Sequence, residues 1–186
     1  MHEASFFTAA AAAVALSVTA TSAVGAIADA DHSQIKFIAR QSEVAVDGRF
    51  DRFKADIALD PAHPQGGKVR VAIDLASLQA SGSDANDLLK SKEFLDVERF
   101  PSATFEATSI QAVPGGRLQA SGPFTLKGHS ANVVIIFTTR HDASGMWFEG
   151  GTTISRLAFK VGEGQWADTS TLDDDVQIRF KLHVAR

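Results

Sequence analysis

The sequence of 186 residues contains no cysteine and no tyrosine. Without cysteine the chain cannot form disulfides, use a thiolate nucleophile or bind zinc through sulfur, so burial must hold its fold together. It also has no basic stripe, because 18 Lys and Arg face 22 Asp and Glu, for a formal net charge of −4. We therefore expect no binding to nucleic acid, whose phosphates attract basic surfaces.

Long apolar runs are scarce as well. The first, "FFTAAAAAVALSV" at residues 6–18, is shorter than a membrane span. Small residues follow it, with cleavage expected after Ala23, Ala26 or Ala30. This pattern predicts a secretory signal peptide over residues 1–26, and hence export to the periplasm. The leader has no Lys or Arg before its apolar run, so a buried Ala-rich helix and a disordered leader remain alternatives.

The remaining chain, from about residue 31 to 186, is expected to form one soluble domain. Its last segment, "VQIRFKLHV" at residues 176–184, alternates apolar and polar residues without exception, which is typical of a half-buried strand. Seven earlier segments are also strand-like: 33–39, 44–61, 68–75, 102–113, 117–126, 131–140 and 146–155. The second of these is irregular and predicts a bulge near Arg52.

Short turns join most of these segments, which predicts antiparallel neighbours and favours a closed barrel over a sandwich. The one helical pattern lies at residues 81–101, where Ser81 and Ser83 can cap a helix that buries Leu88 and Leu89. The predicted fold is all-β: an eight-stranded antiparallel up-and-down, lipocalin-like barrel with one short capping helix.

The predicted inward face carries an aromatic ring on almost every strand, and none has a hydroxyl: Phe37, Phe53, Phe105, Phe124, Phe137, Phe148 and Phe180. Alanine and glycine share that face. Large and small residues together can interdigitate into a filled core, or they can leave a tall, narrow apolar channel. The pattern alone leaves both possibilities open.

Catalytic and metal-binding motifs are missing from the sequence. The six histidines show no metal-ligand spacing, and His183, which has outward parity, is expected to be a solvated surface residue. Asp173, Asp174 and Asp175 lack the spacing of an EF-hand, so we expect a solvated loop there. We expect no catalytic residue, no metal and no cofactor, and therefore a protein that is not an enzyme.

Five segments in order resemble the YceI-like family of exported bacterial lipid-binding proteins, over about Asp31 to Arg186. "DHSQIKFIAR" is similar to the family's opening strand and "VAVDGRFDRFKADIALDP" to its glycine–phenylalanine strand. "ANDLLKSKEFLDVERFPSATFEATSI" resembles the helix that leads through an F-D-x-x-x-F-P motif into a strand. "SGPFTLKGHSANVVIIF" resembles the G-x-L-T-x-x-G hairpin, and "ISRLAFKVGEGQWADTSTLDDDVQIRFKL" the closing segment.

The resemblance implies a periplasmic lipocalin-like barrel that binds a polyisoprenoid chain, such as the tail of a quinone or a polyprenol, without catalysis. The implied lipid-binding residues are the seven phenylalanines above together with Ile154, Phe159 and Trp166, with Val161 beside them. The chain departs from the family where Ser42 and Glu43 replace a Met-Gly pair and where Leu95 replaces an aromatic residue. Both departures are expected at the barrel mouth, where the head group of a lipid would lie.

A second hypothesis is a protein-interaction module, for instance a partner of a membrane redox enzyme, with a filled barrel as its scaffold. The loop around Trp166 would then be the contact surface, because loops commonly carry function. Transient contact with a membrane or with membrane redox proteins, and assembly into a homodimer, are also left open by the sequence.

Overall fold

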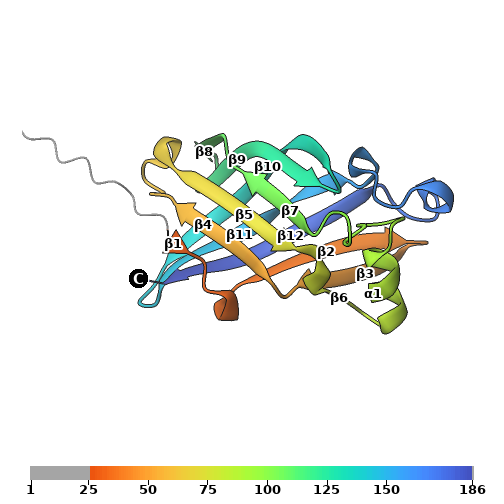
Figure 1. The fold of residues 1–186 in the computed structure, drawn as a ribbon. Helices are drawn as coiled ribbons and strands as arrows, with labels where there is room; N and C mark the ends of the chain where they lie inside the picture. The colour runs from red at the N-terminus through yellow and green to blue at the C-terminus, as the bar shows by residue number, and fades with distance from the viewer. Residues whose placement is uncertain (1–25, 186) are drawn as a thin grey trace, which may run out of the picture.

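The computed structural model describes residues 26–185 (Figure 1). Most of the predicted signal peptide lies outside the described residues. Twelve strands form a single sheet: β1 (Ala26–Ile27), β2 (Gln34–Gln41), β3 (Val44–Phe50), β4 (Phe53–Ala58), β5 (Lys68–Asp74), β6 (Leu78–Ala80), β7 (Ser102–Glu106), β8 (Ser109–Val113), β9 (Arg117–Leu126), β10 (His129–His141), β11 (Gly145–Ser155) and β12 (Asp175–Ala185).

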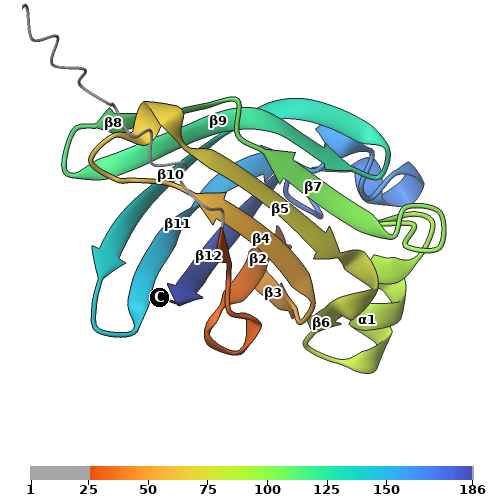
Figure 2. The same ribbon diagram turned by 60° about the vertical axis from the view of Figure 1, so that its left-hand side comes forward.

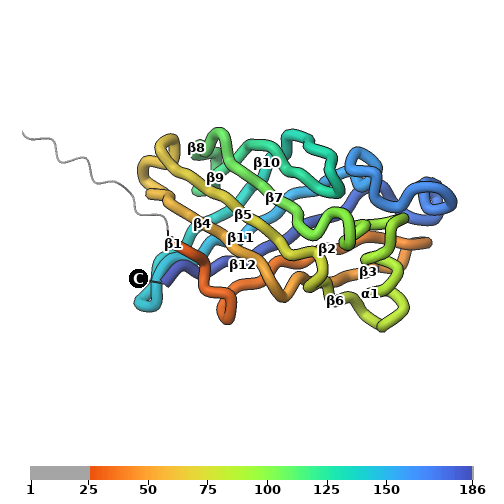
Figure 3. Tube along the Cα trace, viewed as in Figure 1, coloured from red at the N-terminus to blue at the C-terminus, as the bar shows by residue number. Residues whose placement is uncertain are grey.

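The sheet is antiparallel at every pairing, in the order β1-β4-β5-β7-β9-β10-β11-β12-β2-β3-β6, and β8 pairs with β9 beside this path. β3 and β4 lie near opposite ends of the order, yet only Asp51 and Arg52 separate them in the chain. The sheet must therefore curl so that its two ends approach each other, and the tube in Figure 3 follows this curl. The prediction of an all-β, antiparallel, barrel-like sheet is confirmed, but a closed lipocalin-like barrel is not, because no strand pairing within residues 26–185 joins the two ends of the order.

The predicted count of eight strands is not confirmed. Two predicted segments, 44–61 and 102–113, are each divided into two strands, and β1 and β6 lie outside the predicted segments. β3 and β4 are divided beside Arg52, where the sequence predicts a bulge. There Ser77 O accepts a hydrogen bond from Asp51 N at 3.2 Å, and Ser77 Oγ accepts one from Arg52 N at 2.9 Å. β5 and β6 are divided by the 3-10 turn η3 (Leu75–Ser77) that holds this serine, and β7 and β8 by Ala107 and Thr108.

One α-helix, α1 (Ser83–Lys90), is present in the described residues, as predicted. It lies at one end of the curled sheet, beside β3 and β6 (Figure 2). Its N-cap is Gly82 rather than one of the two serines that the sequence suggests. The side chain of Asn86 fixes the helix to the sheet instead, since its Oδ1 accepts a hydrogen bond from Ala80 N at 2.7 Å.

Four further 3-10 turns complete the chain: η1 (Ala30–His32), η2 (Pro64–Gly66), η4 (Leu157–Phe159) and η5 (Gly164–Ala167). The turns η4 and η5 lie at the same end of the sheet as α1, whereas β1, η1 and the C-terminal end of β12 lie at the other end (Figure 1). Within residues 26–185, no helix is both long and apolar enough to cross a membrane.

Candidate functional site

The interior of the curled sheet holds two apolar cavities. The first, cavity 1, lies at the α1 end and has a volume of about 170 Å³. β2 lines it with every second residue and α1 covers it with one face: Ile35, Phe37, Ala39 and Gln41 from β2, and Ala85, Leu88 and Leu89 from α1. Gln41 and Arg156 are the only amide or charged side chains among its described lining.

The second, cavity 2, lies farther along the strands, towards the end where β1 pairs with β4. Its volume is about 80 Å³. The hydroxyl of Thr152 is its only polar side-chain group among the described residues, and this hydroxyl already donates to Val134 O at 2.8 Å. Cavity 2 therefore offers a ligand nothing but apolar surface.

Four side chains line both cavities and so form the partition between them: Ile35, Ile73, Phe124 and Ile178. Ile35 and Phe124 are buried, with 4% and 7% of their surfaces exposed. The interior is thus neither the filled core nor the continuous channel that the sequence leaves open. It is a row of two cavities that movement of these four side chains would join.

Eight of the ten lipid-binding residues implied by the family resemblance line a cavity. Phe37, Ile154 and Trp166 line cavity 1, Phe124 lines both, and four line cavity 2: Phe105, Phe137, Phe148 and Phe180. Phe53 and Phe159 line neither. Phe159 is only 1% exposed and packs edge-on against Phe124, with the ring centroids 5.3 Å apart. It therefore stabilises the position of Phe124 in the partition without lining a cavity itself.

The ring of Phe37 depends on the glycine opposite it. Phe37 on β2 pairs with Gly48 on β3, and a Cβ atom at Gly48 would lie 2.5 Å from the ring carbons of Phe37. The ring therefore covers the space that any larger residue at position 48 would fill. This close approach gives the wall of cavity 1 a flat aromatic surface.

The structure adds lining residues to cavity 1 that the lipid-site prediction omits. Leu88, Leu89 and Phe94 are noted in the sequence only as parts of a helical segment, yet all three line the cavity. The spacing of Leu88 and Leu89 on one helix face is a signal for burial, but it does not say what the face covers. That information comes only from the position of α1 over the open end of the sheet.

Trp166 in η5 is half-buried, although the interaction hypothesis requires it to be exposed. Its ring packs against Phe94 at a centroid distance of 5.4 Å, and its Nε1 donates to Glu93 Oε2 at 3.0 Å. The indole thus joins η5 to the segment after α1. Since Trp166 also lines cavity 1, a ligand there would touch it.

Arg156, directly after β11, organises the loop that carries Trp166. It is 2% exposed, and its five N–H groups meet five backbone carbonyls at 2.7–3.0 Å, those of Val161, Gly162, Trp166, Leu172 and Asp173. Burial lowers the pKa of the Arg156 guanidinium from its ordinary value, while the nearby Asp174 carboxylate acts to raise it. Because every donor is used, Arg156 has none left for a ligand head group.

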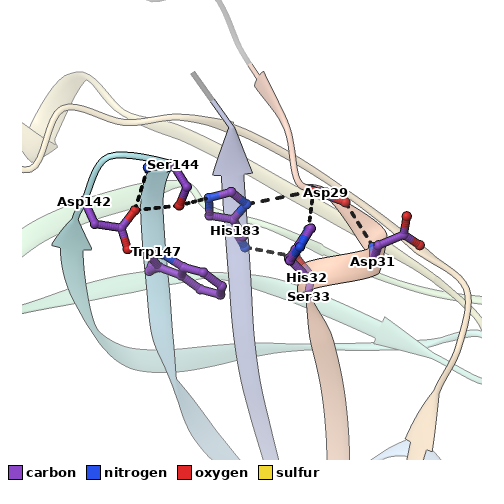
Figure 4. A network of polar contacts seen from close by, with 8 residues as sticks. All are labelled: Asp29, Asp31, His32, Ser33, Asp142, Ser144, Trp147 and His183. Atoms are coloured by element: carbon purple, nitrogen blue, oxygen red, sulfur yellow. Dashed lines mark hydrogen bonds and ion pairs between the residues drawn. The ribbon is translucent and has the colours of Figure 1, made fainter.

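A polar network at the other end of the sheet surrounds His183 (Figure 4). The prediction that His183 is solvated is wrong, since only 4% of its surface is exposed. Its outward parity is correct, but the residues before β2 and the ring of Trp147 cover it: Ser33 Oγ accepts a hydrogen bond from His183 N, and the two rings are 4.4 Å apart. No sequence signal near His183 indicates this cover.

The comparison with protein families agrees with this architecture. Residues 27–184 match the model of the YceI-like domain. The chain belongs to the YceI-like family. Curated relatives include a UPF0312 protein of Ectopseudomonas mendocina, which is 30% identical over 120 residues, or 61% of this chain and 63% of that protein. The alignment thus spans less than two thirds of that YceI-like relative.

Solved YceI-like structures share the fold. BcnA of Burkholderia cenocepacia is 33% identical, with a TM-score of 0.81 over 83% of this chain and 98% of that one. The Campylobacter jejuni YceI protein is 23% identical with a TM-score of 0.67, over 75% of this chain and 84% of that one. A polyisoprenoid binding domain from Saccharophagus degradans is 16% identical with a TM-score of 0.66, over 87% of this chain and 99% of that one.

Proposed function

We propose that this protein binds one long isoprenoid-type lipid chain, such as the tail of a quinone or a polyprenol, inside the curled sheet. The observation that carries the proposal is the row of two cavities with an almost wholly apolar lining. The polyisoprenoid binding domain of Saccharophagus degradans, which has the same fold, supports this class of ligand. The protein would act as a carrier in the periplasm, without catalysis and without a cofactor.

Burial of hydrocarbon would drive binding. Each CH₂ group removed from water contributes about 0.8 kcal/mol, of which ordering of the chain offsets a part. A long chain gains most when it fills both cavities, and to do so it must displace the partition that includes Phe124. Short chains can occupy cavity 1 alone, so affinity should rise with chain length.

A role as a partner of a membrane redox enzyme has less support. Its predicted contact residue, Trp166, uses its ring against Phe94 and its Nε1 on Glu93, and so offers little free surface. The same position suits Trp166 as a reporter of ligand in cavity 1.

The test is native mass spectrometry of the protein purified without detergent, before and after organic extraction. We expect an added mass that leaves on extraction, matches a prenylated lipid and returns when quinones or polyprenols are added. The Trp147→Phe variant, whose only tryptophan is Trp166, should show a fluorescence change on the same additions. A protein that is free of lipid, and that neither gains mass nor changes fluorescence with any isoprenoid, would overturn the proposal.

A further inference from the structure

Three metal-ligating side chains meet at the end of the sheet opposite α1. Asp29, His32 and His183 each offer one ligand atom, and these atoms lie within 4.8 Å of one another (Figure 4). Asp29 and His32 come from the segment before β2, whereas His183 comes from the last strand, 150 residues after Ser33. This grouping depends on the fold, since Asp29 N donates to His183 O at 2.7 Å and so fixes the two segments together.

Hydrogen bonds on the far side of the His183 ring determine its tautomer. Asp142 Oδ1 accepts the Ser144 hydroxyl proton at 2.6 Å, and the other oxygen of Asp142 accepts from Arg140 and Trp147. These bonds, led by that of Ser144, lower the pKa of Asp142 far below its ordinary value, so it remains an acceptor. Since the one proton of Ser144 goes to Asp142, the contact of 3.1 Å between Ser144 Oγ and His183 Nε2 is a bond donated by His183.

In the neutral ring, the Nδ1 atom of His183 therefore carries the lone pair. This atom is buried and has no hydrogen-bond partner among residues 26–185, and it faces Asp29 Oδ2 at 4.0 Å. Asp29 Oδ2, which also contacts His32 Nδ1 at 2.6 Å, is a carboxylate oxygen and so is an electron-pair donor as well. Two electron-rich atoms that face each other in a partly buried site are stabilised by a cation between them.

We propose that Asp29, His32 and His183 bind one divalent transition-metal ion such as Zn²⁺. In a tetrahedral site with bonds of about 2.0–2.1 Å, neighbouring ligand atoms lie about 3.3 Å apart. His32 Nδ1 and Asp29 Oδ2 are 2.6 Å apart, and His183 Nδ1 and Asp29 Oδ2 are 4.0 Å apart. Both distances lie within about 0.7 Å of the tetrahedral separation, and the exposed His32 side chain can turn to adjust them.

The types of ligand atom indicate which metal ions the site would bind. Two imidazoles and one carboxylate suit Zn²⁺, Ni²⁺ or Cu²⁺ better than Ca²⁺ or Mg²⁺, which prefer oxygen ligands. The bond from His183 Nε2 to Ser144, with Asp142 behind it, is the outer-shell support that commonly orients a metal-bound histidine. The bound ion would link the segment before β2 to the end of β12. This site is separate from the two apolar cavities.

The experiment is calorimetric titration of Zn²⁺ into the chain purified without a histidine tag and freed of metal with a chelator. We expect one ion per chain, and we expect the unfolding temperature to rise with Zn²⁺ because the ion binds only the folded protein. Co²⁺ as a probe should give the visible absorption of a four-coordinate ion with nitrogen and oxygen ligands.

Three variants test the ligands. Asp29→Asn changes a part-buried side chain and His32→Gln an exposed one. Each removes a ligand and should lower the affinity by at least the loss usual for an outer-shell partner, about ten- to a hundredfold, while His183→Asn should abolish binding. The matched control is His63→Gln, because His63 also contacts an aspartate three residues away, Asp60 at 3.1 Å, but has no third ligand among residues 26–185. His63→Gln should leave the affinity unchanged.

Three results would overturn the proposal. One is the absence of stoichiometric binding to the folded chain. Another is an equal loss in His63→Gln and His32→Gln, which would indicate nonspecific binding by surface histidine. The third is stability that depends on pH through His183 but not on Zn²⁺, which would mean that a proton rather than a metal ion joins His183 to Asp29.

Discussion

The two ends of the curled sheet each bury a nitrogen-rich side chain, but the two are satisfied differently. At the α1 end, all five N–H groups of Arg156 meet backbone carbonyls. At the opposite end, His183 contacts Ser144 through Nε2, and its Nδ1 has no partner in the described part of the chain. Buried polar groups are nearly always paired, so the saturated arginine indicates a structural role, whereas the unpaired histidine nitrogen is the atom on which the proposed metal site depends.

The ends also differ in how they close. Cavity 1 reaches the α1 end, where a short helix and the loop around Arg156 cover it with apolar side chains. At the other end the first described residues link two parts of the sheet, since β1 pairs with β4 and Asp29 N donates to His183 O at 2.7 Å. We therefore expect a lipid chain to enter past α1 and η5 rather than past this linked end.

The largest effect should come from Arg156→Met. The change leaves five buried carbonyls without donors, and we expect the free energy of unfolding to fall by about 3–5 kcal/mol. Gly162 is part of this arrangement, because it has a φ of +74° and a Cβ there would meet Arg156 Nη1 at 2.7 Å. Denaturant unfolding measures the loss, and hydrogen exchange should show that the loop of residues 161–174 opens.

The control for Arg156 is an exposed arginine with a carboxylate partner. Arg70 on β5 makes two hydrogen bonds to Glu106 Oε1, at 2.7 and 3.0 Å. Arg70→Met should cost less than about 1 kcal/mol, as is usual for surface ion pairs. An equal loss of unfolding free energy in the two variants would contradict the view that the five hydrogen bonds of Arg156 stabilise the loop.

A substitution in cavity 1 should reduce binding of every isoprenoid. Ala39→Trp places a large ring where β2 lines the cavity, and we expect about a hundredfold loss of affinity, because the ring takes the space of several CH₂ groups. Ala45→Trp, on the neighbouring strand but exposed, should bind as the wild type does. Native mass spectra at rising lipid concentration measure the affinities of both variants, and this signal does not depend on the added tryptophan.

A substitution in cavity 2 should act only on long chains. Val133→Trp fills that cavity, so a chain long enough to cross the Phe124 partition should bind about tenfold more weakly, while a short chain should be unaffected. Val134→Trp is the matched control, since Val134 is 46% exposed on the opposite face of β10. If short and long chains lost affinity equally, the two cavities would not be filled in sequence.

Much of this fold follows from local patterns. Strict alternation predicts β12 and the inward phenylalanines correctly, because side chains on a strand point alternately to its two faces. The irregular segment around Arg52 predicts a bulge at the right place, but the structure has there a break between two strands that lie near opposite ends of the sheet order. The turn that separates β5 from β6 is not predictable from alternation. It depends on a hydrogen bond between Ser77 and Arg52, which lies 25 residues earlier in the chain, between β3 and β4.

The candidate sites are predictable to different degrees. The lining of cavities 1 and 2 follows from parity, yet whether it encloses space depends on how Ile35, Ile73, Phe124 and Ile178 meet from four separate strands. His183 is unpredictable for the same reason. Its outward parity is evident from the sequence, but its burial comes from Asp29 and Ser33, which are distant in the chain and carry no hydrophobic signal.

The smallest effect should be the pH dependence of the end near His183. Asp142 has a pKa lowered mainly by the hydrogen bond from Ser144, and also by those from Arg140 and Trp147. A carboxyl whose pKa is lower in the folded state stabilises the fold at pH values above its unfolded pKa of about 3.9. That contribution is lost as pH falls from there through the folded pKa.

Asp142→Asn should therefore be less stable than the wild type at neutral pH, and the difference should shrink once the pH falls below about 4. Unfolding temperatures of both proteins across this pH range measure the effect. Asp47→Asn, an exposed carboxyl on β3, serves as the control and should show little difference at any pH. A difference between wild type and Asp142→Asn that stays constant to acid pH would mean that Asp142 acts through its shape rather than its charge, and the tautomer assigned to His183 would lose its support.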